Sequence, residues 1–285
     1  MSAGLDDMRA WIGRTETMTD VATAWPVAAL NATFDRREAE PMSGDAIPEG
    51  WHWLYFLETK PASELAHDGH AKRGGFLPPV PLPRRMWAGG RIDFHRALRV
   101  GEALRRDSEI ASIEPKQGKS GSLVFVTVRH TVYASGELAV VEEHDIVYRE
   151  AARPTDSPPQ PKRAPEATQW RHEITPDEVM LFRFSALTFN SHRIHYDLDY
   201  VRNEESYPGL VVHGPLQTLL MLDLCRRNSA RVKRLEYRAQ QPVFHTERMT
   251  VGGNPATDGG QVALWTANGA GNYAMTGTAT VSGSS

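Results

Sequence analysis

The chain has 285 residues, of which 40% are hydrophobic and 24% charged, and its formal net charge is −3. A chain of this composition can form a large hydrophobic core. It lacks the strong excess of basic residues that a nucleic-acid-binding surface requires. One cysteine excludes an intrachain disulfide, and no apolar run reaches membrane-spanning length. Residues 1–20 carry acidic groups and lack an apolar signal core, so we expect a cytoplasmic protein without nucleic-acid or membrane partners.

The first half begins with helical patterns and continues with strands. Residues 4–13 and 20–34 are predicted to be helical, and the apolar run at 51–58 is predicted to be a strand. Residues 73–90 are rich in proline and glycine and predict a loop. From residue 91 to 150 strands dominate, with a hairpin turn at Ser-Gly-Glu 135–137.

A proline-rich segment divides the chain. Residues 151–167 read "AARPTDSPPQPKRAPEA" and contain almost no large apolar side chain, which is typical of an extended linker. We therefore predict an N-terminal domain at 1–150 and a C-terminal domain at 168–285, each of ordinary domain size.

The second half repeats the order of elements in the first. Residues 168–202 predict loop and short helix, and "HGPLQTLLMLDLCRR", residues 213–227, predicts a helix. Four strands follow, at residues 232–244, 247–253, 261–269 and 272–281. We therefore expect an α+β protein in which each half is a long helix wrapped by a curved antiparallel β-sheet.

The helix at 213–227 is almost entirely apolar, which predicts burial on all sides. Pro215 suits the first helical position, where no N–H donor is needed. The N-terminus of such a helix offers unpaired backbone N–H groups and a partial positive charge, which can stabilise an oxyanion.

The segment "FSALTFNSHRIHYDLDY", residues 184–200, gathers groups that can move a proton. Asn190, His192, His195 and Asp197 lie close together in sequence. A neutral imidazole accepts a proton near physiological pH, and a carboxamide can hold a water molecule. Water activation beside an oxyanion site is what hydration of an α,β-unsaturated thioester requires.

Two stretches resemble the signatures of the MaoC-like, R-specific enoyl-CoA hydratase family. "ALTFNSHRIHYD" resembles the family pattern A-L-[ST]-x-D-x-N-P-[LI]-H-x-D, and "GLVVHGP" resembles the glycine- and histidine-containing start of the family's central helix. Within this family, the two stretches are most similar in sequence to a subgroup of mesaconyl-C4-CoA hydratases, itaconyl-CoA hydratases and 3-hydroxyacyl-thioester dehydratases. The resemblance implies a double hot-dog fold, an acyl-CoA substrate, no metal and no separate cofactor.

The family's functional residues transfer to this chain position by position. The catalytic histidine falls on His195, and the catalytic aspartate falls on Asn190, which cannot act as a base. The resemblance therefore implies that His195 activates a water held by Asn190, with the thioester oxygen on the helix N-terminus at Gly214, next to His213.

Two further residues and the assembly have less defined roles. Asp197 is expected to cap a short helix or to orient a histidine. Arg193, next to the motif, is a candidate partner for a free carboxylate on a short, branched dicarboxylic acyl chain. A second copy of the chain, forming a homodimer, is a candidate partner besides the substrate.

Alternative functions remain open from sequence. A hot-dog thioesterase would cleave the thioester, and an acyl-CoA-binding protein would bind without turnover. A metal enzyme would use His192 and His195 with His213 or Asp197 as a third ligand. The family resemblance favours the hydro-lyase without metal.

Overall fold

One antiparallel sheet runs through the whole molecule. A computed structural model of the chain describes residues 8–118, 121–150 and 160–282. Within these residues ten strands pair in the order β1-β3-β4-β5-β2-β7-β10-β9-β8-β6. The strands of the first half are β1 (Thr15–Val21), β2 (Arg84–Phe94), β3 (Ala103–Gly118), β4 (Gly121–Ala134) and β5 (Glu137–Arg149). Those of the second half are β6 (Trp170–Ile174), β7 (Arg231–Ala239), β8 (Met249–Pro255), β9 (Gln261–Ala267) and β10 (Tyr273–Ser282).

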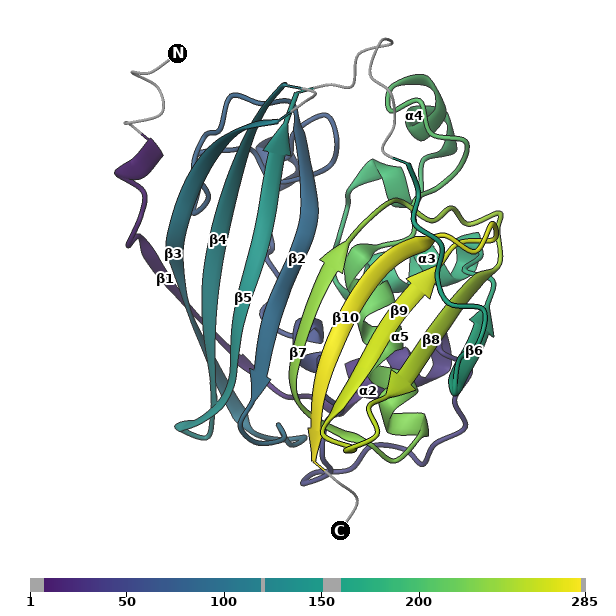
Figure 1. Cartoon of the computed structure of the whole chain (residues 1–285). Helices are drawn as coiled ribbons and strands as arrows, with labels where there is room; N and C mark the ends of the chain where they lie inside the picture. The colour runs from purple at the N-terminus through teal and green to yellow at the C-terminus, as the bar shows by residue number, and fades with distance from the viewer. Residues whose placement is uncertain (1–7, 119–120, 151–159, 283–285) are drawn as a thin grey trace.

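The helices lie mainly on the second half. They are α2 (Ala24–Thr33), α3 (Glu178–Leu187), α4 (Leu198–Asn203) and α5 (Gly214–Arg227), with 3-10 turns η1 (Trp51–Leu54), η2 (Ala62–Glu64) and η3 (Arg193–His195). Figure 1 shows α5 behind strands β7 to β10, and α5 contacts these strands. Its leucines are the centre of the main hydrophobic core, as its apolar sequence predicts.

The two halves of the sheet join where β2 pairs with β7. Gly89 to Asp93 pair with Arg238 to Arg234 in an antiparallel register. A Cβ atom at Gly89 would lie 2.4 Å from the carbonyl oxygen of Tyr237, so only glycine allows this approach. The prediction of a loop over residues 73–90 is therefore wrong from Arg84 onward, because these glycines serve strand pairing and not a turn.

Two other predictions for the first half were wrong. Residues 51–58 do not form a strand: η1 follows Gly50, whose φ of 85° is left-handed, and Trp51 is buried in the core. Residues 15–21 form the edge strand β1, which the sequence analysis did not predict. The helix of the first half, α2, has 10 residues, against 14 in α5, and packs on α3 and η1.

Other predictions were confirmed. The hairpin turn at Ser135 and Gly136 joins β4 to β5, and both residues have positive φ. The helix and the four strands of the second half are present. Residues 151–159 of the expected linker and residues 4–7 of the first expected helix lie outside the described residues, and the two domain boundaries stay predictions. No helix among the described residues is long and apolar enough to cross a bilayer.

The packing of α5 yields a stability prediction. Leu219 is fully buried, and its side chain lies against Gly50 of the first half. Leu219→Ala should reduce the free energy of unfolding by about 3 kcal/mol, because it removes buried methyl groups and leaves a cavity. Urea denaturation measures this. Val179→Ala, at a side chain that is 58% exposed on α3, is the control, and an equal loss in both variants would contradict the packing.

Candidate active site

The motif segment 184–200 folds as tight turns between α3 and α4. After α3 ends, Phe189 adopts a left-handed φ of 48°. The side-chain oxygen of Asn190 then accepts the backbone N–H of His192 at 3.0 Å, a turn contact that asparagine favours. The turn leads into η3, which delivers His195 to the interior.

His195 is a buried imidazole with a fixed tautomer. Its Nδ1–H donates to the backbone carbonyl of Val211 at 2.7 Å, so the Nε2 lone pair remains available as an acceptor. Burial lowers the pKa of His195 to about 4. The ring is therefore neutral at physiological pH and able to accept a proton.

His213 and Gly214 place the start of α5 beside His195. The rings of His213 and His195 stack, with centroids 3.6 Å apart and planes 18° apart. His213 Nε2 lies 2.9 Å from Ser185 Oγ, which fixes the fully buried ring. Gly214 is the first residue of α5, and a Cβ there would lie 3.4 Å from the ring of Trp87, from the first half. His195, the N-terminus of α5 at Gly214 and Trp87 of β2 therefore lie together in one place.

Arg193 and Asp197 pair with each other. Asp197 caps α4, because one carboxylate oxygen accepts the backbone N–H of Tyr200 at 3.0 Å. The other oxygen accepts from Arg193 Nη2 at 2.8 Å, and the guanidinium lies 4.3 Å from the ring centroid of Tyr200. Among the hydrogen bonds of the described residues, none joins Asp197 to a histidine.

The structure therefore brings together some of the residues predicted from sequence. His195, His213 and Gly214 are in one place. Asn190 is attached to the backbone of His192, whose ring meets that of His195 edge to face at 5.5 Å. The hydrogen bonds of the described residues include none between Asn190 and His195.

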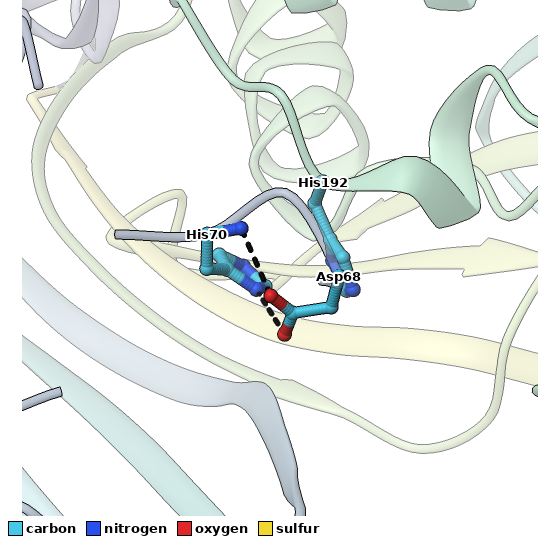
Figure 2. A group of neighbouring side chains, drawn as sticks. All are labelled: Asp68, His70 and His192. Atoms are coloured by element: carbon cyan, nitrogen blue, oxygen red, sulfur yellow. Dashed lines mark hydrogen bonds and ion pairs between the residues drawn. The ribbon is translucent and has the colours of Figure 1, made fainter. Parts of the chain in front are cut away.

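Two residues of the first half, Asp68 and His70, were missed. His70 Nδ1 lies 2.9 Å from Asp68 Oδ2, and the ring of His70 lies against that of His192 with centroids 3.9 Å apart. Figure 2 shows Asp68, His70 and His192 side by side. The only signal was "HDGH" at residues 67–70, a turn-like sequence with nothing that connects it to a motif far along the chain.

Asp68, His70 and His192 are also the residues that could hold a metal. Their ligand-type atoms lie within 4.8 Å of one another. However, two imidazoles on one zinc ion, each bound at about 2.1 Å, would have ring centroids about 5 Å apart. The centroids of these rings are only 3.9 Å apart, with planes tilted by 40°, and Asp68 already bonds His70. The geometry fits a carboxylate–imidazole pair better than a metal site.

A cavity of about 510 Å³ lies away from these histidines. It is lined by residues around η1 and the start of β7, including His52, Arg96 and Lys233. Neither His195 nor Gly214 lines it, so it is separate from the candidate active site.

A curved sheet in two halves, one buried helix and a neutral base at that helix's N-terminus define a double hot-dog protein with an acid/base site. Solved structures agree with this fold. A MaoC-like dehydratase superimposes with a TM-score of 0.70 at 15% identity, covering 97% of this chain and 100% of that one. A Mycobacterium tuberculosis protein described as having a double hot-dog fold gives 0.57 at 14% identity, covering 99% and 100%. The fold expected from sequence is confirmed.

Sequence comparison gives the family. The model of the family "hydroxyacyl-thioester dehydratase type 2" matches residues 50–245. The mesaconyl-C(4)-CoA hydratase of Chloroflexus aurantiacus is 46% identical over 239 residues, which are 84% of this chain and 85% of that protein. The chain belongs to the hydroxyacyl-thioester dehydratase type 2 family. The predicted enzyme class, a hydro-lyase of the hydratase/dehydratase type, is thereby confirmed.

The two roles considered for Asp197 can be separated by substitution. Asp197→Ala should reduce the free energy of unfolding by about 1 kcal/mol, because α4 loses its cap. Asp197→Asn should lose less, since asparagine caps about as well as aspartate. Urea denaturation measures both. A stable Asp197→Asn protein without hydratase activity would instead show that the carboxylate acts in the chemistry.

Proposed function

We propose that this hydratase/dehydratase adds water reversibly to a 2-enoyl-CoA, giving a 3-hydroxyacyl-CoA, and that its acyl chain is short, branched and dicarboxylic, of the mesaconyl-C4 or itaconyl type. His195 takes a proton from water, which attacks the β carbon. Negative charge then develops on the thioester oxygen, and the α carbon receives a proton. CoA is part of the substrate, and no separate cofactor is needed.

The observation that carries this proposal is the state of His195. Its Nδ1–H is held by Val211, and its pKa, lowered by burial, keeps the ring neutral. A neutral ring with a free Nε2 can act as a base without first losing a proton. Because one imidazole can both take and return the proton, a syn addition needs no second acid at position 190.

The start of α5 suits the developing negative charge. Gly214 N–H belongs to the unpaired first turn of the helix, and Pro215 follows it. Such donors and the positive end of the helix dipole stabilise an oxyanion in a site from which water is excluded. His213, stacked on His195, holds the base and this N-terminus in contact.

Asn190 can contribute through its amide N–H groups. Its side-chain oxygen accepts the N–H of His192, and its NH₂ group is a donor that can point to the oxygen of a water molecule. The amide can therefore orient the oxygen of the attacking water while His195 removes its proton.

Recognition of a second carboxylate needs a cation that has no carboxylate partner. Arg193 is occupied by Asp197. Arg85 lies on β2 opposite Tyr148. Burial lowers the pKa of His70 and of His192, and the charge of Arg85 lowers both further. No ion pair between Arg85 and a carboxylate occurs in the described part of the chain, so Arg85 is the stronger candidate.

The chemistry is tested with a panel of CoA thioesters. His195→Gln should reduce kcat/KM for hydration by about a hundredfold to ten-thousandfold, because the base is lost.

For the unsubstituted protein, kcat/KM should rise with pH and reach half its maximum near pH 4, since only the neutral ring accepts a proton. Loss of enoyl-thioester absorbance and release of free thiol are followed in parallel.

His172→Gln, on β6, is the matched control for His195→Gln and should keep activity. Thiol release without hydration would identify a thioesterase instead. Binding without turnover, unchanged in His195→Gln, would identify an acyl-CoA-binding protein.

Arg85 determines the choice of acyl chain in this proposal. Arg85→Gln should raise KM for a dicarboxylic enoyl-CoA about tenfold or more, because a hydrogen bond to a charged group is lost. KM for crotonyl-CoA, which has no second carboxylate, should stay the same. Arg84→Gln removes a neighbouring guanidinium that pairs with Glu205, and serves as the control. Equal effects on both substrates would contradict the assignment.

A further inference from the structure

A loop of the first half, residues 66–71, is docked on the motif of the second half. Arg193 N–H donates to the carbonyl oxygen of Asp68 at 2.9 Å, and Ser191 Oγ donates to that of Gly69 at 2.5 Å. Gly69 has a φ of 87°, and a Cβ there would lie 1.9 Å from the carbonyl oxygen of Ser191. Only glycine fits this contact, so the loop is a fixed part of the candidate active site.

Within this loop Asp68 holds His70 in one orientation. Asp68 Oδ2 accepts the Nδ1–H of His70 at 2.9 Å, and Asp68 Oδ1 accepts the backbone N–H of His70 at 3.0 Å (Figure 2). Both side chains are largely covered, with 30% of Asp68 and 23% of His70 exposed. The hydrogen bond fixes the tautomer of His70 and leaves its Nε2 without a proton.

From His70 a row of imidazoles leads to the proposed base. The ring of His70 lies 3.9 Å from that of His192, the ring of His192 lies 5.5 Å from that of His195, and the ring of His195 lies 3.6 Å from that of His213. A proton on any of these rings acts on the others in a low-dielectric interior.

We propose that Asp68 and His70 are positioning residues of the active site: Asp68 supplies, from the first half of the chain, the negative charge that Asn190 lacks, and its effect reaches His192 and His195 through His70. This inference rests on the proposed hydration. It accounts for a motif that has imidazoles at positions 192 and 195 but no carboxylate at position 190.

His195 becomes a positively charged imidazolium when it takes the proton from water in the proposed reaction. Arg73 and Arg85 face His70 and, with the neighbouring rings, disfavour a further positive charge there. Burial lowers the pKa of His70 and of His192, and the carboxylate of Asp68 partly offsets this lowering in both rings. Without this charge, the protonated state of the group is less stable, and the transition state that leads to it is higher.

Substitution of each member tests the proposal. Asp68→Asn should keep the loop in place but reduce kcat about tenfold to a hundredfold with little change in KM, because only the charged state loses stabilisation. The pH of half-maximal kcat should also move, because Asp68 acts on the protonation of His70 and a charge on His70 lowers the pKa of His195. His70→Gln should have a similar effect, and the double variant should be no worse than either single one, because the two residues act as a unit.

Glu64→Gln is the matched control, because it removes one exposed carboxylate from the segment just before the same loop. It should leave kcat and the pH profile unchanged. Unfolding midpoints of all variants show whether the loop is only structural: a kcat loss that follows the midpoint, with the pH profile unmoved, would overturn the inference.

Two further outcomes are decisive. A stoichiometric metal in the purified protein, lost together with activity in Asp68→Asn, would make these residues ligands and overturn the positioning role. If the unsubstituted protein hydrates enoyl-CoA and His195→Gln does not, while Asp68→Asn behaves like the unsubstituted protein, this inference fails and the proposed function stands. If the unsubstituted protein does not hydrate any thioester of the panel, the proposed function itself fails.

Discussion

The pairing of β2 with β7 is the constraint on which the rest of the structure depends. It joins two five-stranded halves into one sheet, and it is possible only because Gly89 lets β2 approach the backbone of Tyr237. This pairing also brings residues of the first half into contact with the candidate active site. Trp87, beside the bulge in β2, comes to rest against Gly214, and the loop that precedes β2 reaches the motif at residues 191–193. A single backbone contact therefore assembles a site from both halves.

The site consists of buried imidazoles that remain neutral. Histidines are costly to bury when charged. Here the carbonyl of Val211 accepts from His195 Nδ1, and the hydroxyl of Ser185 bonds His213 Nε2, while His213 Nδ1 has no partner among the described residues. Burial lowers the pKa of both. In the proposed reaction, the neutral ring of His195 begins as a base, and the imidazolium that it becomes is acidic enough to give the proton back. The apolar α5 adds the positive end of its dipole, and its N-cap residue is the neutral His213.

The halves differ in what they contribute. In the second half, α5 packs against strands β7 to β10 and carries the proposed oxyanion site at its start. In the first half, the short turn η1 packs on the sheet through Glu142, which accepts hydrogen bonds from His52 and Trp53, each at 2.9 Å. The helix of the first half, α2, packs on α3 and η1, and what the first half supplies to the candidate site is the wall at Trp87 and the loop at residues 66–71. Such a division makes the two halves interdependent, since neither contains a complete site.

The sequence by itself determined the features that depend on interactions between residues close together in the chain. The apolar run of α5, the turn at Ser135 and Gly136, strands β7 to β10 and the family signature around His195 were all predicted, because periodicity, turn residues and motif spacing act over a few residues. Strand β6 lies in a stretch that was expected to be loop and short helix. Only the tertiary structure decided the rest. The glycines of β2 looked like a loop, Trp51 and its neighbours looked like a strand, and Asp68 and His70 carried no sign that they meet His192. Those features depend on contacts between residues distant in sequence, which no local pattern encodes.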